Sequence, residues 1–271
     1  MNAKLFISLI LALIAIPLSF GQTQTDTVHV NLSGIDVVAE RNKIFSDMGR
    51  IVTVLSKKDI QKLSVNSIDE LLESIPGIDI RNRGINGTQA DISMRGGSFD
   101  QVLVLLNGVN ITDPQTGHYN LDIPLDLADV MRVEVLQGSS ARIYGPNAFS
   151  GAINIVTEKN IKKELTGQLT GGSYNSFGQS LTAALGSEKI QSFISLSHKS
   201  SEGYRENTDF RMYNAFSQTI IRTENAGKFD FQASYQQKAY GANGFYSLAY
   251  PNQFDFTRTI FSALNWSLSK G

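Results

Sequence analysis

The fold is decided by a stretch that reads Phe229-Asp230-Phe231-Gln232-Ala233-Ser234-Tyr235-Gln236. Phe, Phe, Ala and Tyr occupy one face and Asp, Gln, Ser and Gln the other, which is the period of two expected of a β-strand with one apolar face. Residues 177–185 and 260–268 repeat this alternation, and residues 190–198 and 211–222 follow it less regularly. We therefore expect about six strands of roughly ten residues between 164 and 271, the length that a tilted strand needs to cross a bilayer.

The predicted connections between these strands differ in length. Residues 186–188 and 225–227 read as tight turns, whereas residues 200–210 and 240–254 read as long loops rich in glycine and tyrosine. Short turns at one end and long loops at the other are typical of an outer-membrane β-barrel. A soluble β-sandwich alternates in the same way, so a secreted β-sandwich adhesin with an α+β N-terminal domain stays open at this point.

The N-terminus has the composition of an export signal. Lys4 precedes an apolar stretch over residues 5–16, and Pro17 and small residues follow as far as Gly21. Twelve residues rise about 18 Å as a helix, which is shorter than the roughly 30 Å hydrocarbon core of a bilayer. We therefore predict a cleavable signal peptide over residues 1–21 and a protein that leaves the cytoplasm.

Composition excludes several classes of function. The chain has 24 Lys and Arg against 25 Asp and Glu, so it lacks the basic excess of a nucleic-acid-binding protein. It has no cysteine, which excludes thiolate zinc sites, iron–sulfur clusters and cysteine nucleophiles. His29, His118 and His198 are far apart, and no phosphate-binding or nucleophile motif is present. We expect no enzymatic activity, no resident metal or cofactor and no nucleic-acid partner.

Residues 43–160 predict one compact α+β domain. Ser56-Lys57-Lys58-Asp59 and Ser67-Ile68-Asp69-Glu70 read as capping boxes, and Pro76-Gly77 stops the second helix. The run Val102-Leu103-Val104-Leu105-Leu106 is apolar throughout, as in a strand buried on both faces. We expect a strand over these five residues. Further strands are expected at 50–55, from residue 78, and at 91–95 and 133–136, and together they complete one small sheet.

Several runs of this domain occur in a recognisable order. They include Val54-Leu55-Ser56-Lys57-Lys58-Asp59-Ile60, Ile92-Ser93-Met94-Arg95-Gly96-Gly97 and Gly151-Ala152-Ile153-Asn154-Ile155-Val156-Thr157. In this order, residues 51–159 resemble the plug domain of TonB-dependent outer-membrane receptors. The resemblance implies a plug lodged in a barrel of about 22 strands. It also implies energy-coupled import of a scarce nutrient, such as a ferric siderophore or cobalamin, with force transmitted by TonB from the inner membrane.

The resemblance further implies a TonB box, which we place at Ile35-Asp36-Val37-Val38-Ala39 in a leader over residues 22–42. A short β-prone stretch in such a leader can add as a strand to the sheet of its partner. The expected partners are therefore TonB, the lipid of the bacterial outer membrane and a small nutrient or metal-chelate ligand.

Two further sets of site residues follow from the resemblance. For contact between plug and barrel we expect Arg95, Gly96 and Gln137, although Gln137 stands where the family usually has a second arginine and cannot supply its ion pair. Substrate would meet the outward loops at residues 81–89 and 110–120. The candidate substrate-binding side chains are Arg83, Asn86, Asp113, Gln115, His118 and Tyr119, with Phe245 and Tyr246 as apolar contributors.

Length limits how much of a barrel this sequence contains. A barrel of about 22 strands needs about 220 residues in strands alone, whereas only 108 follow residue 163. We therefore expect an α+β plug domain followed, over residues 164–271, by antiparallel transmembrane β-barrel strands, about six of an expected 22, which form an incomplete barrel. The alternative is a stand-alone, plug-like periplasmic protein that binds TonB without transport.

Overall fold

The computed structural model describes residues 52–138, 146–157 and 163–268. The predicted signal peptide, the leader and the predicted TonB box at Ile35, Asp36, Val37, Val38 and Ala39 lie outside these residues. In the described part of the chain, no helix has the length and apolarity needed to cross a membrane.

The α+β domain contains two sheets, where the sequence predicted one. The larger has the order β1-β6-β7-β4-β5, and β2 pairs only with β3. The bounds of these strands are β1 Val52–Ser56, β2 Ile78–Asn82, β3 Ala90–Met94, β4 Val102–Leu106, β5 Val109–Asn110, β6 Arg132–Gln137 and β7 Gly151–Val156. The helical segments are α2 Lys57–Ile60, α3 Ile68–Glu73, η1 Phe99–Gln101, η2 Gly117–Tyr119, η3 Leu127–Asp129 and η4 Pro146–Ala148.

The centre of the larger sheet is a strand that the sequence did not predict. β7 pairs parallel with β4 and antiparallel with β6, and all six of its residues are buried. Its one long polar side chain, Asn154, accepts a hydrogen bond from the backbone N–H of Gly108 and donates one to Glu134. β4 is buried at all five positions, as predicted.

Both predicted capping sequences begin helices, but only the first forms a full capping box, because the Glu70 side chain accepts from the N–H of Asn66 rather than of Ser67. Asp59 Oδ2 accepts from the backbone N–H of Ser56 at 3.1 Å and from its hydroxyl at 2.6 Å. These hydrogen bonds hold the pKa of Asp59 below its ordinary value, because they favour the charged carboxylate. At the second helix, Ser67 Oγ accepts from the N–H of Glu70 at 3.4 Å. α3 ends before Pro76, as predicted.

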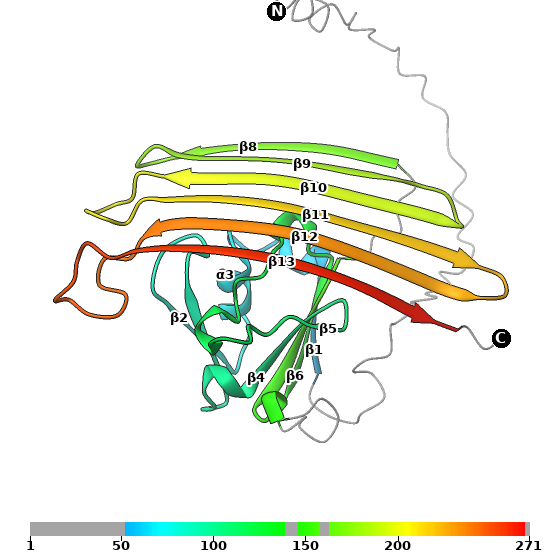
Figure 1. Cartoon of the computed structure of the whole chain (residues 1–271), viewed down its shortest axis with the longest axis horizontal. Coiled ribbons are helices and arrows are strands. Elements are labelled where there is room, and N and C mark those ends of the chain that lie inside the picture. The colour runs from blue at the N-terminus through cyan, green and yellow to red at the C-terminus, as the bar shows by residue number, and fades with distance from the viewer. Residues whose placement is uncertain (1–51, 139–145, 158–162, 269–271) are drawn as a thin grey trace, which may run out of the picture. The chain divides into compact units, whose positions relative to one another are not determined.

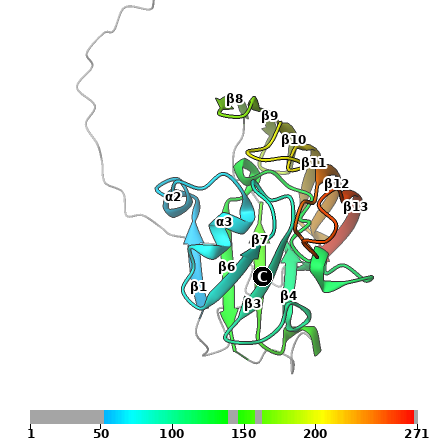
Figure 2. The same ribbon diagram turned by 90° about the vertical axis from the view of Figure 1, so that its left-hand side faces the viewer.

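The rest of the chain forms one antiparallel sheet of six strands (Figure 1). The strands are β8 Lys163–Gly172, β9 Ser176–Gly186, β10 Ile190–Ser201, β11 Phe210–Thr223, β12 Gly227–Gly241 and β13 Phe254–Ser267. They pair in sequence order, so β8 and β13 form the two edges and the sheet is not closed. Figure 2 views these strands nearly end-on, where they follow a curved line. The prediction of about six antiparallel strands is confirmed.

The connections partly follow the predicted asymmetry. Turns at 187–189 and 224–226 are short, and the loop at 242–253 is long. At the same end as that loop, however, β8 and β9 are joined by only residues 173–175, and Tyr174 accepts a backbone hydrogen bond from Glu202 of the next loop. One connection at the long-loop end is therefore as short as those at the other end.

The two faces of this sheet are inverted relative to a soluble protein. On one face Phe231 is 49% exposed, Leu264 66% and Trp266 59%. On the other, Gln232, Gln236 and Lys238 are buried. Soluble proteins bury apolar side chains and expose long polar ones, whereas a transmembrane barrel turns apolar residues to lipid and polar residues inward. The burial pattern therefore favours barrel strands over a β-sandwich.

Candidate functional site

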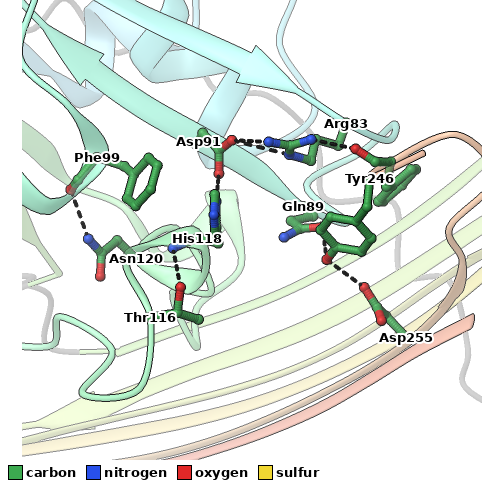
Figure 3. A network of polar contacts seen from close by, with 10 residues as sticks. Arg83, Gln89, Asp91, Phe99, Thr116, His118, Asn120, Tyr246 and Asp255 are labelled. Atoms are coloured by element: carbon green, nitrogen blue, oxygen red, sulfur yellow. Dashed lines mark hydrogen bonds and ion pairs between the residues drawn. The ribbon is translucent and has the colours of Figure 1, made fainter.

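Asp91, at the second position of β3, joins the two loops that the sequence predicted as a ligand face. We call residues 81–89 and 110–120 the apical loops. Asp91 Oδ2 accepts from Arg83 Nε at 3.1 Å and from Nη2 at 2.6 Å, and Asp91 Oδ1 lies 2.7 Å from His118 Nδ1 (Figure 3). Because an ionised carboxylate only accepts, His118 donates from Nδ1. Arg83 and His118 are thus brought together through one buried carboxylate.

The long loop between β12 and β13 reaches the same network. Arg83 Nη1 donates to the carbonyl of Phe245, and the guanidinium lies 5.7 Å from the ring centroid of Tyr246. The Tyr246 hydroxyl lies 2.9 Å from both Gln89 Oε1 and Asp255 Oδ2 (Figure 3). Burial, together with the hydrogen bond to Asp255, raises the pKa of Tyr246 well above its ordinary value. The phenol therefore remains a protonated donor at neutral pH.

The other predicted ligand residues have different surroundings. Burial raises the pKa of Tyr119 above its ordinary value. Asp113 Oδ1 accepts from the backbone N–H groups of Gln115 and Thr116, so Asp113 shapes its own loop. Gln115 is exposed, and Asn86 occupies a left-handed turn with φ 53°. Among the described residues, no cluster of His, Asp and Glu is placed to hold a metal ion.

Strand β12 holds the α+β domain through side chains at alternate positions. Gln232 Oε1 accepts from Asn107 Nδ2 at 2.9 Å, Gln236 Nε2 donates to the carbonyl of Ile123 at 2.8 Å, and Lys238 Nζ lies 2.8 Å from Asp122 Oδ1. Two apolar patches accompany these polar contacts: Phe193 and Phe216 join the core of the domain, and Ile85 packs against the cluster that contains Tyr240 and Phe245. Sequence reasoning missed these contacts, although their signal was present as long polar residues on the face of β12 opposite its aromatic residues.

The predicted plug–barrel residues lie elsewhere on the domain. Arg95 and Gly96 form an exposed turn with φ 51° and 79°, and Gln137 Nε2 donates to the carbonyl of Pro76 at 2.6 Å. Within residues 52–138, 146–157 and 163–268 the structure shows no ion pair for Arg95. The contact of Arg95, Gly96 and Gln137 with a barrel wall therefore stays a prediction.

The role of Asp91 can be tested with one matched pair of substitutions. Asp91→Asn removes the charge that holds Arg83 and His118, and leaving these partly buried donors without a full partner costs about 1 kcal/mol. We expect trypsin to cleave after Arg83 about tenfold faster, because the loop opens more often. Asp113→Asn is the control, since one amide oxygen can still accept both backbone hydrogen bonds. Equal cleavage rates in the two variants would contradict this role for Asp91.

Comparison with known proteins shows which proteins this chain is similar to. The model of the TonB-dependent Receptor Plug Domain family matches residues 46–152. The "Vitamin B12 transporter BtuB" of Vibrio cholerae is 33% identical over 157 residues, which cover 56% of this chain and 25% of that protein. The protein of that name in Vibrio vulnificus strain YJ016 is 26% identical over 207 residues, covering 75% of this chain and 33% of its own. The chain thus spans a quarter to a third of the length of these relatives.

Solved structures give the same fold. The pyoverdine-bound FpvA of Pseudomonas aeruginosa has a TM-score of 0.64 at 17% identity, over 83% of this chain and 33% of that one. The ferric yersiniabactin uptake receptor FyuA of Yersinia pestis has a TM-score of 0.57 at 22% identity, over 72% of this chain and 32% of that one. Residues 46–152 therefore match the TonB-dependent receptor plug domain family, and the α+β domain with its six antiparallel strands has the fold of TonB-dependent receptors.

Proposed function

We propose that this chain supplies the plug and six barrel strands of an outer-membrane transporter that takes up a scarce nutrient, a ferric siderophore or cobalamin, with energy delivered by TonB. In this proposal residues 1–21 are a cleaved signal peptide and residues 22–42 carry the TonB box. Residues 43–160 form the plug, and residues 164–271 form the barrel strands.

The observation that carries the proposal is the polar contact between plug and strand β12. A typical hydrogen bond contributes only about 0.5–1.5 kcal/mol net, because water replaces the lost partner. Separating two apolar surfaces instead costs about 25 cal/mol for each Å² of apolar surface that becomes exposed to water. Uncharged polar contacts such as those of Gln232 and Gln236 can therefore separate and become hydrated when the leader is pulled. That displacement would open a path for the bound nutrient.

Two cations at the apical loops are neutralised by partners, which favours an uncharged cargo over a multiply anionic one, whereas Arg81 at the start of the first loop is exposed. Arg83 is paired with Asp91, and Lys238 with Asp122, so neither cation is left to neutralise an anionic ligand. Tyr119 and Tyr246 add aromatic surface and hydroxyl groups beside them. We infer that cobalamin, rich in amides, fits this face better than a multiply anionic ferric chelate. The vitamin B12 transporters among the relatives support the same choice.

The apolar outer face of the barrel strands distinguishes this proposal from a periplasmic protein that binds TonB without transport. Exposed side chains such as Phe231, Leu264 and Trp266 would meet water in the periplasm and lipid in the outer membrane. The transporter is therefore the better account of these six strands.

The test is to express the intact gene product in cells that lack their own cobalamin receptor, with and without TonB. We expect the protein in the outer-membrane fraction and accumulation of radiolabelled cyanocobalamin only when TonB is present. Uptake of radiolabelled ferric siderophores, measured in separate assays, tests the other class of cargo. A soluble periplasmic product that binds TonB and takes up neither label would establish the alternative.

A further inference from the structure

Lys238 of strand β12 contacts the plug with all the hydrogen-bond donors of its ammonium group. The residue is only 3% exposed, and its ammonium lies 2.6 Å from the carbonyl of Gly87, 2.8 Å from Asp122 Oδ1 and 3.4 Å from the carbonyl of Thr88. A lysine ammonium has three donors and no acceptor. Each of its donors therefore has a partner on the plug.

These three partners come from two separate segments of the plug. Gly87 and Thr88 belong to the apical loop that carries Arg83, whereas Asp122 follows the apical loop that carries His118 and Tyr119. Asp91 links the apical loops to each other, and Lys238 links the first to strand β12 directly and the second through Asp122, whose backbone N–H donates to the carbonyl of Tyr119. One side chain of the barrel thus holds both halves of the candidate ligand face.

The ion pair with Asp122 makes the Lys238 contact stronger than the uncharged contacts beside it on β12. Asp122 and Lys238 are both buried, so their attraction is screened much less than that of a surface pair. Removing one partner leaves the other as an unpaired buried charge, which is strongly unfavourable. Gln236, one inward position earlier on β12, contributes only uncharged hydrogen bonds.

We propose that Lys238 is a positioning residue for the ligand face: it fixes both apical loops against strand β12 and releases them together when the plug is displaced. This inference rests on the proposed function in taking the apical loops as the surface that binds cargo. The positioning itself depends only on the contacts of Lys238 and is measurable without any ligand.

Lys199 provides a matched control within the same sheet. Its ammonium also crosses from a barrel strand to the plug, where it lies 3.0 Å from Asp126 Oδ2 and 3.1 Å from the carbonyl of Asn66. Neither of these partners belongs to an apical loop. Replacing either lysine should therefore weaken the attraction between plug and barrel, whereas only replacing Lys238 should loosen the apical loops.

The decisive measurement is hydrogen exchange of backbone amides in the intact gene product in detergent, without ligand. In Lys238→Met we expect exchange at residues 84–89 and at residues 111–122 to rise about tenfold or more, while the strands of the plug sheet keep wild-type rates. Lys199→Met should leave both apical segments unchanged. Lys238→Arg should restore much of the protection, because arginine keeps the charge and several donors.

Two results would overturn the positioning role. One is equal exchange in the apical segments of Lys238→Met and Lys199→Met, and the other is faster exchange confined to a single apical loop. If Lys238→Met does not assemble, the double variant Lys238→Met/Asp122→Asn avoids an unpaired buried charge and must show the same loosening of both loops. Wild-type rates in the double variant would equally refute the proposal.

Affinity for cyanocobalamin separates this inference from the cargo proposal. We expect Lys238→Met to bind it about tenfold more weakly, and Lys199→Met to bind it like wild type. If wild-type protein does not bind cyanocobalamin, the cargo proposal fails, and the exchange data alone decide the role of Lys238. If wild type binds and Lys238→Met binds equally well, Lys238 does not position the ligand face.

Discussion

Replacing Val37 with proline is expected to reduce uptake to the level of cells that lack TonB, while ligand binding at the cell surface is retained. Proline has no backbone N–H and its φ is fixed near −65°, so it interrupts the ladder that a TonB box would form with the sheet edge of TonB. Val37 is the central residue of the predicted box. The effect should be close to complete, because no other segment of the chain is proposed to receive the pulling force.

The measurement compares radiolabelled cargo taken up by energised cells with cargo bound to the same cells on ice. Thr25→Pro is a suitable control, since Thr25 lies in the same leader but outside the predicted box. It should transport like wild type. Unchanged uptake in Val37→Pro would show that the box has been assigned to the wrong residues, and loss of uptake in both variants would show that the whole leader matters.

The second large effect is expected from Gly151→Val, at the start of the central strand β7. A Cβ atom at this position would lie 2.1 Å from Met94 Sδ and 2.6 Å from the carbonyl oxygen of Leu136. The methionine can turn aside, but the backbone of β6 cannot move without disturbing the sheet. Overpacking of a core costs about 1–3 kcal/mol and occasionally more, and we expect at least about 3 kcal/mol here.

The same substitution at Gly167 of β8 is the control, because its nearest neighbour would be the carbonyl oxygen of Ser180 at 4.0 Å. We expect the plug of Gly151→Val to be digested by protease in isolated outer membranes under conditions in which wild type and Gly167→Val stay intact. A protease-resistant Gly151→Val plug would mean that β6 and β7 tolerate a wider separation than their packing indicates.

The elements that sequence predicted well are those whose signal is local. Alternation along Phe229–Gln236 depends only on which side of a strand each residue faces, and that period survives in β12 and its neighbours. The caps at Ser56 and Ser67 likewise depend on groups three residues apart. Burial of β4 followed from five consecutive apolar side chains.

What sequence did not predict depends on distant partners. β7 contains Gly151, Ala152 and Asn154, which are weak strand formers, and only the strands on both sides make it a strand. Asp91 lies 27 residues from His118, and Lys238 lies 116 residues from Asp122. The periodicity of a sequence carries no information on such distant pairs. A lysine at an inward position of a predicted membrane strand nevertheless indicates that its ammonium has a buried partner.

Under the proposed function, the polar residues of β12 would also limit how well the outer membrane stays sealed. Gln232, Gln236 and Lys238 are wettable groups at alternate positions along the wall. With the plug drawn aside they would offer water a continuous path, and small solutes such as antibiotics could follow it. In the proposed transport cycle these hydrogen bonds would therefore also have to re-form quickly, because each displacement of the plug would briefly expose the periplasm to the outside medium.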